Sequence, residues 1–161
     1  MRSRLILASF VVVVGVAVYA STVLATPPTA VTPTEYGIGK LGPIATSGSI
    51  GAWSAKMNVT RASDLHVLSN RIAPGGSFGW HSHPGPSFVI VKSGTATVYL
   101  GADRKCRPHR FLAGSGFVDK GLAVHVVRNE GRRDLVTVVV SFTPRGAERR
   151  IDEARPGNCP F

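Results

Sequence analysis

Residues 75–94, GGSFGWHSHPGPSFVIVKSG, carry the pattern on which the fold prediction rests. Two histidines, His81 and His83, stand one residue apart between a glycine-rich segment and a run of β-forming residues. Residues i and i+2 of a strand point to the same side of a sheet, so the two imidazoles are expected to project together. Two convergent imidazoles are a candidate metal site, since imidazole nitrogens bind transition metals at about 2.0–2.1 Å.

The body of the chain reads as β-structure. From residue 50 to residue 143 no helical period stands out, and short runs of β-forming residues alternate with glycine and proline. Many short strands with such breaks are typical of an antiparallel sandwich or a small barrel. We therefore predict an all-β domain with strands at residues 56–61, 65–73, 87–92, 95–100, 123–128 and 135–142. The next residues, 145–154, suit either one short helix or a charged strap.

A third histidine strengthens the metal hypothesis. His125 lies in AVHVVRN, where the neighbouring valines face the opposite side of the predicted strand. A histidine on a buried strand needs a polar partner, because burying an unpaired polar group is unfavourable.

At this point the chain resembles the cupin superfamily, and in particular its small exported bacterial members. The resemblance covers residues 73–142 and rests on two glycine-and-histidine motifs. The first comprises Gly75, His81, His83 and Gly94, and the second Gly116, Gly121, His125 and Asn129. The second motif has one extra residue between glycine and histidine, and Asp119 stands where proline is common. The resemblance implies a jelly-roll β-barrel with a divalent metal inside.

The resemblance also implies a ligand set of three histidines and one glutamate. By position the histidines are His81, His83 and His125, whereas the glutamate position falls on Ser87. No acidic residue lies between residues 65 and 101, and the nearest acids, Asp103 and Asp119, have no spacing that recommends them. Three imidazoles without a carboxylate suit iron, copper, nickel or zinc.

Other polar and aromatic residues receive lesser roles. The Ser87 hydroxyl is a poor ligand but can hydrogen-bond a metal-bound water, and Trp80 adjoins His81 at the expected barrel rim. Both are predicted pocket residues. His66 and His109 are predicted not to bind metal, and Asn129 to hold a turn.

The N-terminal segment is predicted to lie outside the barrel. Arg2 and Arg4 precede a long apolar run, so residues 1–25 are either a cleaved signal peptide or a retained signal-anchor helix. Residues 26–49 are rich in Pro, Thr and Gly and are predicted to be a spacer. The barrel is assigned to residues 50–144, and a charged strap with a cysteine-containing tail to residues 145–161. Either reading of the N-terminus places the domain outside the cytoplasm, secreted or membrane-anchored.

The chain has two cysteines, Cys106 and Cys159. An even count in a non-cytoplasmic protein favours a disulfide, which would tie the C-terminal tail to the domain. The alternative is two buried free thiols.

The net charge of +10 does not indicate a nucleic-acid partner. The basic residues are dispersed and partly interleaved with acids, and only 7% of residues are aromatic. Nucleic-acid binding usually needs a basic stripe with aromatic stacking residues. The partners that remain are a small molecule, the membrane through an uncleaved N-terminal segment, and a second copy in a homodimer.

Three functions stay open from sequence. The leading one is an exported protein that binds one divalent metal. If this protein is an enzyme, oxygen-dependent or Lewis-acid chemistry on a small anionic or carbonyl substrate is expected. The second is a non-catalytic envelope module that binds a small molecule or metal. The third is a structural envelope protein with a degenerate site. Fold resemblance alone does not choose among them.

Overall fold

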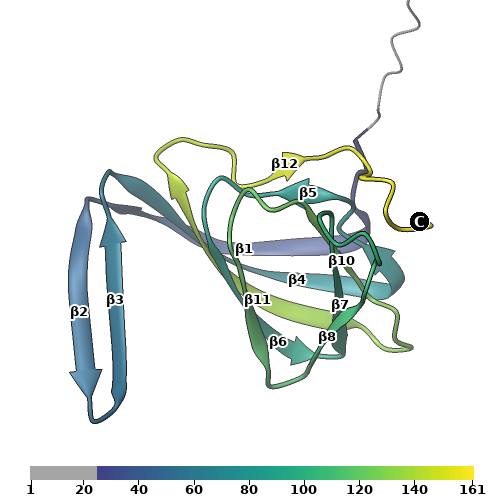
Figure 1. Cartoon of the computed structure of the whole chain (residues 1–161), viewed down its shortest axis with the longest axis horizontal. Helices are drawn as coiled ribbons and strands as arrows, with labels where there is room; N and C mark the ends of the chain where they lie inside the picture. The colour runs from purple at the N-terminus through teal and green to yellow at the C-terminus, as the bar shows by residue number, and fades with distance from the viewer. Residues whose placement is uncertain (1–24) are drawn as a thin grey trace, which may run out of the picture.

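The computed structural model of the chain describes residues 25–161 (Figure 1). The described residues form twelve β-strands and no helix. In chain order the strands are β1 (Thr29–Leu41), β2 (Ile44–Ile50), β3 (Trp53–Val59), β4 (Ser63–Ser77), β5 (His81–Ser82), β6 (Ser87–Ser93), β7 (Thr95–Leu100), β8 (His109–Leu112), β9 (Gly116–Asp119), β10 (His125–Arg128), β11 (Leu135–Pro144) and β12 (Ile151–Asp152).

Ten of these strands curl into a nearly closed barrel, and β2 and β3 form a separate hairpin that projects from it (Figure 1). One face of the barrel has the strand order β9-β6-β11-β4-β1, and the other has the order β8-β7-β10-β5-β12. The two faces join where Arg128 of β10 pairs with Ser77 of β4. This all-β architecture is consistent with the predicted jelly roll.

The predicted strands correspond to β3, β4, β6, β7, β10 and β11. Their period-two pattern explains the core. In β11, Leu135, Thr137 and Val139 point into the barrel and are buried, while the intervening valines lie on its outer side. Leu135 packs in the main apolar cluster with Ile72 and four further buried side chains.

The first strand corrects the spacer prediction. Residues 29–41 form β1, which pairs antiparallel with β4 along most of its length, and residues 44–50 form β2 of the projecting hairpin. The sequence TAVTPTEYGIGKL contains β-formers whose signal was obscured by proline. Pro33 is tolerated because β1 is an edge strand, where a missing N–H need not break a ladder.

The C-terminal segment is a strap rather than a helix. It runs alongside β5, and β12 pairs with β5 through Ile151 and Asp152. The predicted disulfide between Cys106 and Cys159 is present, and Cys159 packs with Trp80, among others, in a second apolar cluster.

The N-terminal prediction remains open. The predicted signal or anchor segment lies almost wholly outside the described residues. Within residues 25–161 there is no helix of the length and hydrophobicity needed to cross a membrane.

Candidate metal site

Three histidines from β5, the residue after β5, and β10 lie close together. His81 is in β5, His83 follows directly after β5, and His125 begins β10 as the cross-strand partner of His81. The centroid of the His81 ring lies 4.9 Å from that of His83 and 4.3 Å from that of His125. One ring nitrogen from each lies within 4.8 Å of the others, and all three residues are buried. The predicted convergence is therefore present.

Backbone carbonyls set the tautomer of each imidazole. The Nδ1 atoms of His81, His83 and His125 lie 2.9, 2.7 and 2.8 Å from the carbonyl oxygens of Gly79, Arg149 and Ala123, respectively. A carbonyl oxygen only accepts, so each Nδ1 carries the hydrogen and donates it. Each Nε2 is then left with a free lone pair, the form in which imidazole binds a metal, held by the type of outer contact found in metalloproteins.

A glycine shapes the entry to β5. Gly79 has a φ of +70°, a left-handed conformation that favours glycine, and its carbonyl accepts from His81. The next residue, Trp80, donates its backbone N–H to Thr26 Oγ1 at 2.6 Å. The segment before β1 therefore helps to position the histidine strand.

Burial disfavours the charged form of His81 and of His83. Burial lowers the pKa of His81 well below its ordinary range, and the nearby His125 and Arg150 lower it further. Burial likewise lowers the pKa of His83, although its bond to the Arg149 carbonyl and the charge of Asp119 oppose the shift.

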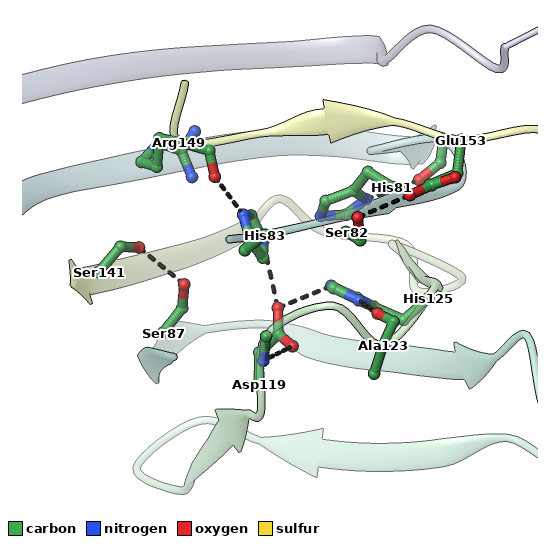
Figure 2. Close-up of polar contacts among 12 residues, drawn as sticks. His81, Ser82, His83, Ser87, Asp119, Ala123, His125, Ser141, Arg149 and Glu153 are labelled. Atoms are coloured by element: carbon green, nitrogen blue, oxygen red, sulfur yellow. Dashed lines mark hydrogen bonds and ion pairs between the residues drawn. The ribbon is translucent and has the colours of Figure 1, made fainter. Parts of the chain in front are cut away.

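Asp119 supplies the carboxylate that sequence analysis did not find. Its Oδ2 lies 3.1 Å from Nε2 of His83 and 3.1 Å from Nε2 of His125, and Figure 2 shows it between the two rings. Sequence analysis gave Asp119 no place in the site, whereas the structure places its carboxylate beside two of the three histidines. In the β6–β9 register Asp119 is the direct partner of Ser87, so the carboxylate stands across one strand from the expected glutamate position.

The sequence pattern that could have placed Asp119 in a strand is only four residues long. Residues 116–119, GFVD, alternate, and Phe117 and Asp119 face inward. A four-residue strand is too brief to stand out, and its pairing with β6 is a non-local contact that no local pattern records.

The atoms around Asp119 Oδ2 are arranged so that they could hold a cation between them. With both imidazoles in the Nδ1–H form, Asp119 Oδ2 faces two lone pairs, and this buried oxygen has no hydrogen-bond donor. Three electron-rich atoms at such distances need a proton or a metal ion among them. Adjacent donors around an ion with bonds of about 2.1 Å are about 3.0–3.4 Å apart, which matches the 3.1 Å contacts.

A cavity of about 40 Å³ adjoins the histidines. Ser87 lines it and shares a 2.8 Å hydrogen bond with Ser141. Trp80 lies elsewhere, 2% exposed in the second apolar cluster and stacked on Phe161. The strap contributes Arg149 and Arg150 to the lining, and burial lowers the pKa of both guanidinium groups. Sequence analysis had not assigned a role to either arginine.

The other histidines and Asn129 lie away from the cluster. His66 is buried against Thr143 Oγ1 at 3.2 Å, and His109 is exposed on β8. The Asn129 side chain donates to the carbonyls of Ile72 and Arg133 and accepts from Gly131 N, so it holds a turn.

The free energy of unfolding of the metal-free protein is expected to fall as the pH drops from about 7 to about 5. An unfolded histidine has a pKa of about 6.5, above that of folded His81, so the unfolded chain binds more protons below this pH. The stability of the neutral form is complete above about pH 6.5 and is lost as the pH falls toward the folded-state pKa. Urea unfolding with chelator present should show a shallower pH dependence for His81→Asn, and identical slopes would contradict the assignment.

Comparisons with known proteins agree with the sequence motifs. The family described as Cupin domain matches residues 70–141. No curated protein matches the chain significantly. A cupin-like protein of Thermotoga maritima is 21% identical over 56% of this chain and 65% of that chain, with a TM-score of 0.49.

Two other solved structures are similar. A Klebsiella pneumoniae protein with a double-stranded β-helix domain is 22% identical over 70% of this chain and 85% of that chain, with a TM-score of 0.46. Bacillus subtilis oxalate decarboxylase, described with Mn(II) centres, is 21% identical over 55% of this chain but only 23% of that chain, with a TM-score of 0.47. The domain match, on a barrel that brings both histidine motifs together, shows that residues 70–141 of this chain form a domain of the cupin superfamily.

Proposed function

We propose that this protein binds one divalent transition metal through Nε2 of His81, His83 and His125, with Asp119 as the adjoining carboxylate. The observation that carries the proposal is the set of three Nδ1–carbonyl bonds, which leaves three lone pairs convergent beside an unpaired carboxylate oxygen. Imidazole with one carboxylate suits iron, copper, nickel or zinc.

The site supports chemistry on a small polar molecule in the adjoining cavity. When bound, such a metal supplies Lewis-acid polarisation of a ligand oxygen. The chain supplies the rest: the buried histidines exclude bulk water, their carbonyl partners keep the rings in place, and the cavity limits the size of what enters. We therefore infer a metal-dependent enzyme acting on a small anionic or carbonyl substrate.

A second candidate function is capture without turnover. Asp119 is the only acidic side chain among the described residues that line the cavity. If Asp119 is a metal ligand, the cavity lacks a carboxylate to act as a general base. A non-catalytic module that holds a metal and a small ligand would need no such group.

We also infer that the domain lies outside the cytoplasm. The disulfide between Cys106 and Cys159 supports this location, because disulfides persist in oxidising compartments. The apolar run near the N-terminus supports export, either as a cleaved signal or as a membrane anchor.

Metal content tests the main proposal. The full chain, produced in an oxidising compartment, is expected to hold close to one metal ion per chain by elemental mass spectrometry. The double variant His81→Ala/His83→Ala should lose it, because two of three imidazole ligands are gone. The control His109→Ala removes an exposed histidine on β8 and should retain the metal. Absence of metal from the wild type after loading with iron, copper, nickel and zinc would refute the proposal.

A further inference from the structure

We propose that the cavity beside the three histidines binds a small carboxylate, gripped by the guanidinium of Arg150 with Arg149 alongside. The inference deepens the proposed function, since it names the class of ligand that would meet the metal. Both arginines belong to the strap, which lies outside residues 70–141, the part of the chain that matches the cupin domain.

Arg150 presents an unused hydrogen-bonding group. Its Nε donates to Asp152 Oδ1 at 2.6 Å, and its Nη2 donates to the Phe78 carbonyl at 2.7 Å. Its Nη1 is buried and has no acceptor. A buried N–H of a charged group without an acceptor is costly, and a carboxylate is the acceptor whose geometry best matches a guanidinium edge.

The charge of the cavity also favours an anion. Its lining contains two arginines, Arg149 and Arg150, and a single acid, Asp119. The Asp119 carboxylate faces His83 and His125, and a bound divalent ion would outweigh its charge. Two partly desolvated cations on one wall are stabilised by a negative ligand between them and the metal site.

The strap holds the two arginines in place from both sides. The Arg149 carbonyl accepts from His83, and Glu153 accepts a 2.7 Å hydrogen bond from Ser82 in β5 (Figure 2). Pairing of β12 with β5 completes the attachment. The anion-binding wall is therefore coupled to the same strand that carries the histidine pair, which fixes its position relative to the metal site.

The cavity floor carries two further unpaired polar groups. Asn70 and Thr137 are direct partners across β4 and β11, 3% and 2% exposed, and both line the cavity. Neither Asn70 Oδ1 nor Thr137 Oγ1 has a hydrogen-bond partner. The threonine hydroxyl can donate to a ligand oxygen, and the carboxamide can pair with a hydroxyl or carbonyl group. Buried polar groups are normally paired, so these two unpaired groups indicate a polar occupant.

The volume limits the size of the ligand. A cavity of about 40 Å³ admits roughly three water-sized groups, which is the size of a carboxylate with one or two further atoms. Acetate and glycolate are probes of this size, whereas benzoate carries a ring that should not fit.

Isothermal titration calorimetry on the zinc-loaded full chain tests the inference. Acetate and glycolate are titrated into the protein, and chloride at equal ionic strength is the control. Both carboxylates are expected to bind and benzoate is not. Arg150→Gln should weaken binding by about tenfold to a hundredfold, since a charge-assisted hydrogen bond is lost. Arg155→Gln makes the same charge change at an exposed position of the same segment and should leave binding unchanged.

Two more variants guard against a misfolded strap. Arg150→Lys keeps the charge but loses the forked geometry, and should bind several-fold more weakly than the wild type. Thr137→Val removes only the floor hydroxyl, and should also weaken glycolate several-fold. Equal affinity of wild type, Arg150→Gln and Thr137→Val, or no binding of either carboxylate to the metal-loaded wild type, would overturn the inference.

Metal content measured on the same samples separates this inference from the proposed function. Carboxylate binding that survives in His81→Ala/His83→Ala, and is still lost with Arg150→Gln, supports the arginine site even without a metal. If the protein holds its full complement of metal but binds neither carboxylate, the arginine site is refuted and the metal proposal stands.

Discussion

Replacement of Asp119 by asparagine is expected to weaken zinc binding by about a hundredfold. Loss of even an outer contact of a metal ligand costs about tenfold to a hundredfold in affinity, and Asp119 contacts Nε2 of both His83 and His125 directly. Asparagine keeps the shape and removes the negative charge that offsets the ion. Competition with a chromogenic chelator would measure the change in dissociation constant.

The matched control is Asp103→Asn. Asp103 is the other acid that sequence analysis considered, but its carboxylate pairs with Arg107 at the surface, so zinc affinity should not change. Rescue provides the sharper test, because Ser87 faces Asp119 across β6 and β9. Adding Ser87→Glu to Asp119→Asn should recover most of the lost affinity by restoring a carboxylate from the neighbouring strand. Unchanged affinity in Asp119→Asn would remove Asp119 from the metal site.

Removal of the disulfide is expected to lower the free energy of unfolding by about 4 kcal/mol. Cys106 and Cys159 are separated by 53 residues, and the loop-closure entropy that this link removes from the unfolded chain has that magnitude. The melting temperature of Cys106→Ser/Cys159→Ser should fall by about 10–20 °C in scanning calorimetry. The tail that the disulfide anchors also covers Trp80 with Phe161.

Two controls separate the covalent link from the packing. Reduction of the wild type should reproduce the decrease seen in the double serine variant. Phe161→Ala keeps the disulfide but removes the ring that stacks on Trp80 and lies 3.9 Å from the Arg128 guanidinium. This variant should lower the free energy of unfolding by less than removal of the disulfide does. A decrease below about 1 kcal/mol after reduction would mean that the tail is held by its side chains rather than by the covalent link.

The parts of the fold that could be predicted are those encoded by local pattern. Runs of β-forming residues located β3, β4, β6, β7, β10 and β11, and glycine and proline breaks separated these strands. β1 was missed because Pro33 masks an edge strand whose partner, β4, lies far along the chain. β12 was missed because two residues carry no period at all.

The residues of the candidate site likewise include some that local spacing predicted and others that only the fold brings in. Spacing within β5 predicted that His81 and His83 would share a side, and the second motif predicted His125 as their partner. Neither pattern contains Arg149 or Arg150, which reach the cavity only because the strap folds back over β5. A segment that packs through a two-residue strand and side-chain hydrogen bonds leaves no periodic signal.

The sequence by itself determined six of the twelve described strands and the shared side of His81 and His83. Each follows from residue type and short-range spacing, because the direction of a strand side chain depends on the parity of its position. Only the tertiary structure decided which carboxylate joins the histidines. Asp119 reaches them through the pairing of β9 with β6, and the register of two strands distant in sequence depends on the packing of the whole barrel rather than on either strand alone.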